Sequence, residues 1–143
     1  MIDIRIQKSN FDPGRQLARL EELHAGAVAA SLSLVAAGED VRAVTIEHYP
    51  AMAKRELARI AGEAEARWPL TGIILIFRHG RLLPGDRFAL IATGARSSAA
   101  ALEACAYLRE QLNARAPFWQ RVLPADAAAQ AATRLPAAHP REA

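Results

Sequence analysis

The segment GIILIFRHGRLLPGDRFALIATG, residues 72–94, decides how the chain folds. Its first part, residues 72–78, is a nearly continuous apolar run, and residues 86–94 form a second apolar segment. Short apolar runs bounded by glycine and proline are typical of buried strands. The polar stretch HGRLLPGD, residues 79–86, separates them. We therefore expect two strands joined as a hairpin or as a wider loop-linked pair.

Upstream, the chain predicts a strand and then a helix. IDIRIQ, residues 2–7, alternates isoleucine with polar residues, which is the period of a strand with one buried face. Asp12 and Pro13 form a helix-start signal, with a capping acceptor followed by proline at the first helical position. We expect a helix to about His24, ended by Gly26. Its buried side would carry Leu17, Leu20 and Leu23.

Two further strands and two further helices are predicted around the opening segment. AVAASLSLV (27–35) and VRAVTIEHY (41–49) form strands separated by a short turn, AAGED (36–40). A helix begins at Pro50 and ends at WPLTG (68–72), and a third runs from about Ser97 to Ala114. The expected buried residues of these two helices are Leu57, Ile60, Ala64 and Trp68, and then Leu102, Cys105 and Leu112.

The order of these elements favours an α+β fold over a doubly wound parallel sheet, because adjacent strands are expected to be joined by short turns. The 143 residues fit one domain, which we place at residues 1–123. Residues 124–143 are rich in alanine and proline and lack aromatic residues, so we expect a partly flexible tail there.

Composition limits the classes of function. Eighteen Lys and Arg against fifteen Asp and Glu give a net charge of +3 without a run of consecutive basic residues, so a nucleic-acid footprint is not indicated. The longest strongly apolar run, residues 73–77, is too short to cross a bilayer. A single cysteine, Cys105, excludes an internal disulfide and is expected in the core. We expect a cytoplasmic protein without a membrane partner.

General catalytic motifs are missing, and the four histidines are too scattered to form a metal site. Two stretches are more informative. In GARSSAAALEA, Arg96 and two serines stand where a strand gives way to a helix, which suits a bound phosphate or, equally, a simple serine cap. In RAPFWQRV, residues 115–122, two aromatic residues lie between two arginines and form either a plug for the core or part of a binding site.

Several of these motifs occur together in one known family. GAVAASLSLV, TIEHYPAMAKREL, RWPLTGIILIFRHGRLLPGD and ATGARSSAAALEACAYLREQLNARAPFWQR appear in that order over residues 26–121. In this, the chain resembles the large, catalytic subunit of molybdopterin synthase. The resemblance implies an α/β-hammerhead fold with a mixed or antiparallel sheet and three main helices. It also implies a homodimer that binds a small ubiquitin-like sulfur-carrier subunit at each end.

The resemblance also implies the chemistry. The carrier's C-terminal thiocarboxylate passes sulfur to cyclic pyranopterin monophosphate, which becomes molybdopterin; no permanently bound cofactor or metal is implied. An anionic pterin and a developing oxyanion need cationic donors and a proton-transfer group. The family's two lysines fall on Asn113 and Gln120, and its histidine-arginine pair falls on Ala95 and Arg96. A further family arginine has no counterpart. The remaining candidate substrate-binding cations are Arg78, Arg115 and Arg121.

Amides can donate hydrogen bonds but cannot carry a charge or exchange a proton at neutral pH. Three hypotheses follow. The chain is a catalytically impaired homologue in molybdenum cofactor biosynthesis, or an active sulfurtransferase with rearranged pocket residues, or a dimeric binding domain for another small anion. The first is favoured because two proton-transfer groups are replaced in one pocket.

Overall fold

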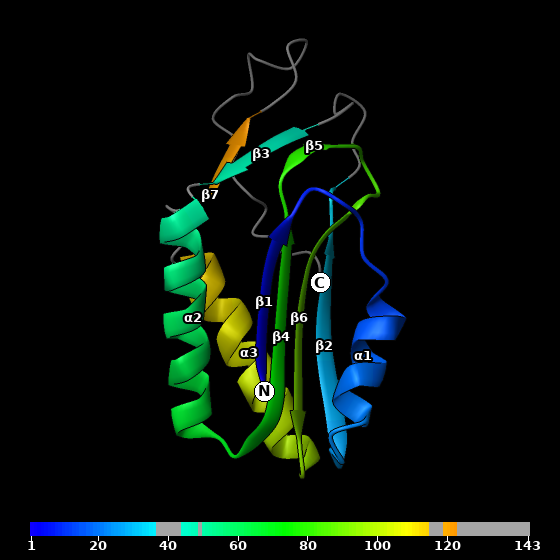
Figure 1. The fold of residues 1–143 in the computed structure, drawn as a ribbon, viewed down its shortest axis with the longest axis vertical. Helices are drawn as coiled ribbons and strands as arrows, with labels where there is room; N and C mark the ends of the chain where they lie inside the picture. Colours follow the sequence, from blue (N-terminus) through cyan, green and yellow to red (C-terminus); the bar gives the residue numbers. More distant parts are fainter. Residues whose placement is uncertain (37–43, 49, 115–118, 123–143) are drawn as a thin grey trace.

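The computed structural model describes residues 1–36, 44–48, 50–114 and 119–122 of the chain. These residues form the strands and helices that Figure 1 shows. The elements in chain order are β1 (Ile2–Gln7), α1 (Pro13–Glu21), β2 (Ala27–Leu34), β3 (Val44–His48), α2 (Pro50–Arg67), β4 (Leu70–Arg78), β5 (Gly80–Leu82), β6 (Arg87–Ala95), α3 (Ser98–Ala114) and β7 (Trp119–Val122).

The main sheet has four strands in the order β1-β4-β6-β2. β4 and β6 pair antiparallel, with Ile74 opposite Ala92, so the strand pair expected from residues 72–94 is confirmed. β2 pairs antiparallel with β6, whereas β1 pairs parallel with β4. The sheet is therefore mixed, and the prediction of an α+β fold with three helices is confirmed.

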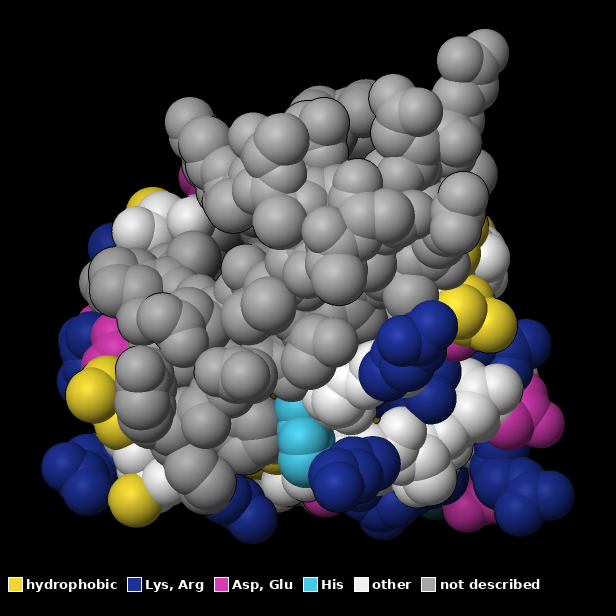
Figure 2. All heavy atoms as spheres, turned by 90° about the horizontal axis from the view of Figure 1, so that it is seen from above, with side chains coloured by type: hydrophobic (Ala, Val, Ile, Leu, Met, Phe, Trp, Pro, Cys, Tyr) yellow, Lys and Arg dark blue, Asp and Glu magenta, His cyan; other side chains and the backbone are white. Residues whose placement is uncertain are grey.

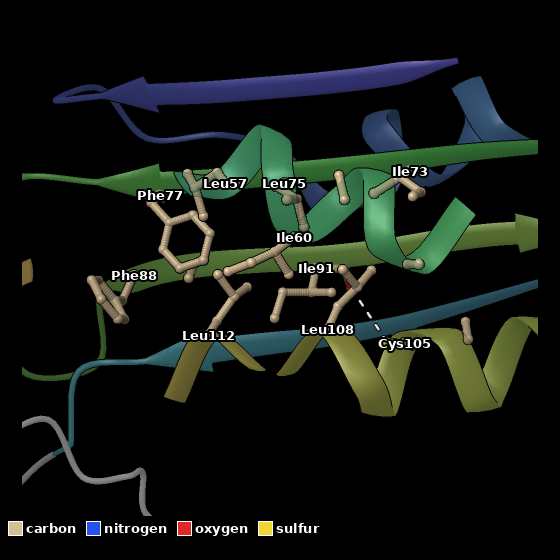
Figure 3. Packing of buried hydrophobic residues seen from close by; sticks show 14 of the residues in the cluster. Leu57, Ile60, Ile73, Leu75, Phe77, Phe88, Ile91, Cys105, Leu108 and Leu112 are labelled. Carbon is tan, nitrogen blue, oxygen red and sulfur yellow. Dashed lines mark hydrogen bonds between the residues drawn. The ribbon is translucent and has the colours of Figure 1, made fainter. Parts of the chain in front are cut away.

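The helices cover both faces of this sheet. In Figure 1, α2 and α3 lie on one face and α1 lies on the other. The larger core joins the buried sides of α2 and α3 to one face of β4 and β6; it includes Leu57, Ile60, Ile73, Leu75, Phe77, Phe88, Ile91, Leu108 and Leu112 (Figure 3). A smaller core under α1 holds Phe11, Leu20, Ile74, Ile76, Leu90 and Ala92. Nearly continuous apolar residues in β4 and β6 follow directly from burial on both faces.

A second, three-stranded sheet, with the order β5-β3-β7, stands at one end of the main sheet (Figure 1). β3 pairs antiparallel with both β5 and β7. The expectation that neighbouring strands would be joined by short turns is therefore wrong for β2 and β3, which lie in different sheets. No strand was predicted for residues 119–122, which form β7. Most of the predicted turn at residues 36–40 lies outside the described residues.

Two predicted helix details are also wrong. α1 ends at Glu21 rather than near His24, and the turn that follows is closed by hydrogen bonds from the N–H groups of Leu23 and His24 to carbonyls three residues back. His24, not Gly26, takes the left-handed backbone conformation, with φ of 60°. On α3, Leu102 is 61% exposed, whereas Leu108 is buried. Alanines supply much of the buried face of α3, so its leucines do not mark that face by themselves.

The remaining expectations about buried residues hold in part, because Leu20 and Leu112 are buried, whereas Leu17 and Leu23 are only half-buried and Ile2 is 38% exposed. Leu57, Ile60 and Ala64 are fully buried on α2, and Trp68 is half-buried beside them. None of the described helices is long and apolar enough to cross a membrane. The predicted tail, residues 124–143, lies outside the described residues, and the domain boundary at residue 123 stays a prediction.

Candidate functional site

The junction between β6 and α3 positions Arg96. Ala95, the last residue of β6, is fully buried, and Arg96 directly after it is exposed. The Ser97 hydroxyl accepts a hydrogen bond from the Ala100 N–H at 3.1 Å, so the serine-cap interpretation of this stretch is confirmed. The cap satisfies one of the free N–H groups at the start of α3. Among the described residues, Arg96 has no ion-pair partner, and its charge faces solvent.

Gly26 fixes the main chain of Arg96 from the neighbouring strand. The Gly26 N–H donates to the Ala95 carbonyl at 2.8 Å. A Cβ atom on Gly26 would lie 2.0 Å from the Arg96 carbonyl oxygen, well inside any allowed contact. Glycine is needed here for close approach of two backbones rather than for an unusual φ. The sequence stretch HAGAV gives no signal for this role.

Arg78 lies at the other end of the sheet, as the last residue of β4. Its Nε and Nη2 atoms donate to the Lys8 carbonyl at 3.1 and 3.0 Å, and its Nη1 atom donates to the Arg87 carbonyl at 3.1 Å. The guanidinium thus ties the segment after β1 to the start of β6. Arg78 holds loops together in this structure, a role that the sequence did not indicate.

The two amide positions belong to this same end. Asn113 is exposed in the last turn of α3. Gln120 and Arg121 lie on β7, where they stand opposite Glu47 and Ile46 of β3. Arg115 lies outside the described residues. The segment containing Gln120 is therefore a strand of the small sheet.

The predicted site residues fall into two groups separated by the length of α3. Arg96 precedes this 17-residue helix and Asn113 lies near its end, and a rise of about 1.5 Å per residue places them roughly 25 Å apart. Figure 1 shows the start of α3 at the far end of the main sheet from β7. One copy of the chain therefore does not bring Arg96 together with Asn113 and Gln120.

A surface depression between α2 and α3 was not predicted. Its volume is about 380 Å³, and it is lined by Glu63, Ala66, Arg67, Tyr107 and Gln111. The Tyr107 hydroxyl donates to Glu63 at 3.0 Å, and the Arg67 guanidinium lies 4.5 Å from the centre of the Tyr107 ring. These contacts join the two helices. The residues that line the depression therefore hold α2 and α3 together.

Cys105 is confirmed as a core residue. It is buried on α3, and its Sγ atom lies 3.7 Å from the Ile91 carbonyl oxygen (Figure 3). Burial raises the pKa of this thiol to about 11, and the charge of Arg109 opposes that shift only in part. A thiol with so high a pKa is protonated at neutral pH and is a poor nucleophile. Within the described ranges, no group of three or more His, Cys, Asp or Glu residues could hold a metal ion.

Comparisons with known proteins agree on one family. Residues 6–115 match the family model described as MoaE protein. The molybdopterin synthase catalytic subunit of Mesorhizobium japonicum is 40% identical over 121 residues, covering 82% of this chain and 76% of that protein. The corresponding subunit of Pseudomonas aeruginosa is 37% identical over 123 residues and covers 82% of each chain.

Solved structures share the fold. The molybdopterin biosynthesis MoaE protein of Burkholderia ambifaria superposes with a TM-score of 0.78 at 35% identity, covering 85% of this chain and 82% of that one. A Helicobacter pylori protein, solved as a complex of subunits 1 and 2 of molybdopterin-converting factor, superposes with a TM-score of 0.70. It is 18% identical, over 84% of this chain and 83% of that one, so this likeness concerns the fold alone.

Proposed function

The chain belongs to the MoaE family, and from that premise we propose that it is a molybdopterin synthase large subunit whose own sulfur-transfer activity is impaired. Its place is in molybdenum cofactor biosynthesis, as the 40% and 37% identical relatives indicate. The observation that carries the impairment is the pair of amides, Asn113 and Gln120, at positions where the family resemblance implies lysines. We place the protein in the cytoplasm, where its single buried thiol would stay reduced.

The amides lower activity for a chemical reason. Sulfur transfer from a thiocarboxylate needs a group that moves a proton and a cation that stabilises the developing negative charge. A neutral amide at Asn113 or Gln120 supplies a hydrogen bond but neither a proton nor a charge. General acid-base catalysis contributes about 10²- to 10⁴-fold per group, so the loss of both groups leaves a slow enzyme. Cyclic pyranopterin monophosphate is the proposed substrate.

The proposal includes a homodimer. Arg96 and Asn113 lie roughly 25 Å apart in one copy, so a site that contains both needs a second copy. β2 offers an apolar surface for such contact, because it is an edge strand of the main sheet and its Leu32 and Leu34 are 43% and 54% exposed. Open edges and clustered exposed leucines are features that association covers. Each of the two sites would then combine Arg96 from one copy with β7 of the other.

A small sulfur-carrier subunit is the proposed second partner. The Helicobacter pylori neighbour was solved as a complex of two different subunits, which supports a two-subunit assembly. We place the carrier's C-terminal end near the small sheet, because β7 carries Gln120 and lies beyond the end of α3, which carries Asn113.

Restoring both lysines tests the proposal. The protein is mixed with thiocarboxylated carrier and cyclic pyranopterin monophosphate, and molybdopterin is measured under single-turnover conditions. We expect slow product formation by the natural chain and an increase of about 100-fold or more in Asn113→Lys/Gln120→Lys, since each lysine restores a proton-transfer group. Gln111→Lys is the matched control, because it adds a lysine to the same helix on the side that faces α2.

The outcomes separate the hypotheses. Product formation by the natural chain as fast as by a lysine-bearing relative refutes impairment and supports the active enzyme with rearranged residues. An equal gain in Gln111→Lys would assign the effect to added charge rather than to the two positions. A complete lack of gain in the double variant contradicts the role assigned to the amides.

A further inference from the structure

The small sheet, which carries Gln120, is joined to the main sheet at both ends of β5. At the first junction, a single residue separates Arg78, the last residue of β4, from Gly80, the first residue of β5. At the second junction, residues 83–86 lead from β5 into β6. The way in which these two junctions are held therefore influences where the small sheet stands relative to the main sheet.

A side chain holds the first junction. Arg78 Nε and Nη2 donate to the Lys8 carbonyl at 3.1 and 3.0 Å, and Nη1 donates to the Arg87 carbonyl at 3.1 Å. The N–H group of His79 donates to the Gln7 carbonyl at 3.0 Å. One guanidinium thus joins the segment after β1 to the start of β6, at the point where β5 leaves the main sheet.

The second junction is held without Arg78. The Asp86 N–H donates to the Leu83 carbonyl at 2.9 Å, and the Leu83 N–H donates to the Asp86 carboxylate at 2.8 Å. Two further main-chain hydrogen bonds, both 2.9 Å long, join Gly85 and Asp86 to Val35. Leu82 at the end of β5 is fully buried in the larger core. A substitution at Arg78 therefore loosens one end of β5 and leaves the other end held.

The path from the first junction to Gln120 is short. Ile46 on β3 stands opposite Gly80 on β5 and opposite Arg121 on β7, and Gln120 is the next residue along β7. Neighbouring strands are about 4.8 Å apart, so β7 lies roughly 10 Å from β5. The strands are joined by main-chain hydrogen bonds, so a shift of β5 moves the main chain at residue 120 with it.

Charge alone does not make Arg78 a substrate contact. Figure 2, which looks down on this end of the molecule, shows several Lys and Arg side chains at the surface. Arg78 is distinguished by its hydrogen bonds, because the Lys8 carbonyl occupies the edge formed by Nε and Nη2. That edge is one of those with which an arginine holds a phosphate in bidentate fashion.

We propose that Arg78 is a positioning residue rather than a substrate-binding cation. It holds β5 so that the main chain at residue 120 is fixed relative to the main sheet. This inference rests on the proposed function and adds to it a residue that acts through the small sheet without touching the substrate. A side chain that transfers a proton from position 120 depends on this placement, since a displacement of about 1 Å can slow a reaction roughly 100-fold.

A double-mutant cycle tests the proposal. Arg78→Lys keeps the charge and removes the fork, and it is made in the natural chain and in Asn113→Lys/Gln120→Lys. Molybdopterin formation is measured in single turnovers over a range of cyclic pyranopterin monophosphate concentrations. At saturating substrate we expect Arg78→Lys to slow the lysine-bearing chain about 10-fold or more and the natural chain less than about threefold, because a neutral amide loses little when it is displaced.

Gly80→Ala is a second variant at the same junction. Gly80 has a φ of 96°, which strains any other residue, so alanine there displaces the start of β5 while Arg78 stays in place. It should show the same dependence on the two lysines. This variant decides the question if Arg78→Lys does not fold.

Hydrogen exchange follows the small sheet directly. Arg78→Lys should speed exchange of the β3 and β7 amides about 10-fold or more and leave the β2 and β6 amides unchanged. Arg19→Lys is the matched control, because Arg19 Nη1 also joins separate elements, donating to Asp3 at 2.7 Å and to Gln16 at 2.8 Å, but lies on α1. The control should change the rate equally in both backgrounds and leave exchange in the small sheet unchanged. Thermal unfolding gives the folded fraction of each variant.

Three results would overturn the positioning role and leave the proposed function standing. These are equal slowing of both backgrounds, unchanged exchange of the β3 and β7 amides, and a higher half-saturating substrate concentration with an unchanged rate at saturation. The last result would make Arg78 a direct substrate contact. If the two lysines give no gain, with or without Arg78→Lys, the proposed function and this inference fail together.

Discussion

Adding one methyl group at Gly26 tests how the β6–α3 junction is held. In Gly26→Ala the new Cβ atom would lie 2.0 Å from the Arg96 carbonyl oxygen and 2.9 Å from its carbonyl carbon. Ordinary contact needs about 3.4 Å, so the two backbones must separate by about 1.4 Å. That movement stretches the Gly26–Ala95 hydrogen bond, which is 2.8 Å long.

The expected cost follows from these two effects. Overpacking against a backbone costs about 1–3 kcal/mol, and a lost hydrogen bond costs about 1 kcal/mol more. Alanine also lowers the conformational entropy of the unfolded chain, and this stabilises the fold by about 0.4–1 kcal/mol. We therefore expect the free energy of unfolding to fall by about 2–3 kcal/mol. For a chain of this size the melting temperature would fall by roughly 10 °C.

Gly62→Ala is the matched control. A Cβ on Gly62 meets no atom within 4 Å, and Gly62 lies inside α2, so we expect a gain of about 0.5–1 kcal/mol from helix propensity. Urea unfolding followed by circular dichroism measures the stability of both variants. The slope of the free energy of unfolding against urea concentration should stay unchanged. Wild-type stability in Gly26→Ala would refute the argument that close approach requires glycine there.

Three further predictions concern a carboxylate, a thiol and the proposed dimer. Burial works to raise the pKa of Asp3, but hydrogen bonds and charge from Arg19 and Arg5 outweigh burial and lower this pKa from its ordinary value of 3.8. Ionised Asp3 therefore stabilises the fold at neutral pH. This contribution is lost as the pH falls through the pKa that Asp3 has in the folded chain. Because the pairs with Arg5 and Arg19 are partly exposed to solvent, Asp3→Asn should lower the free energy of unfolding by about 0.5–1 kcal/mol at pH 7 and by less at pH 3. Equal losses in urea unfolding at both pH values would contradict this. At pH 8, Cys105 should react with a disulfide reagent at least about 100-fold more slowly in the folded chain than in urea, because it is buried and its pKa is about 11; equal rates would show that the thiol is accessible. Leu32→Arg should convert the proposed dimer to a monomer, as measured by light scattering. The control Leu102→Arg, at a residue that is 61% exposed on α3, should leave the dimer intact. A dimer in both variants would exclude β2 as the interface.

Local patterns predicted those parts of the fold that depend on nearby residues. The alternating isoleucines of β1 and the apolar runs of β4 and β6 gave the right strands, because burial imposes a period that the sequence displays. The Asp12–Pro13 signal marked the start of α1 correctly, since the Asp12 side chain accepts hydrogen bonds from the N–H groups of Gly14 and Arg15.

Features that depend on distant partners were missed. β7 has four residues and becomes a strand only by pairing with β3, more than 70 positions earlier. The exposed Leu102 was expected in the core because alanines, which fill the buried side of α3, carry little hydrophobic signal. Local pattern predicts elements, but pairing between elements is decided by tertiary contacts.

For the candidate site, too, the sequence predicted some features and missed those that depend on pairing between distant segments. The family resemblance proposed Arg96, Asn113 and Gln120 as site positions, and the helix predicted from about Ser97 to Ala114 already separated Arg96 from Asn113. The sequence did not predict that Gln120 lies on a strand that pairs with β3. The contacts of Arg78 could not be predicted from the sequence, because its hydrogen bonds join segments 70 residues apart.

The parallel pairing of β1 with β4 sets an order of events during synthesis. β1 is made first, yet its partner positions begin at Ile73, opposite Ile2, so 71 residues must be added before the pairing can start. At roughly 5–20 residues per second the first strand waits about 4–14 seconds. During that time its row of isoleucines has no sheet to join, and a translational pause upstream of Ile73 would prolong the period in which the nascent chain can aggregate.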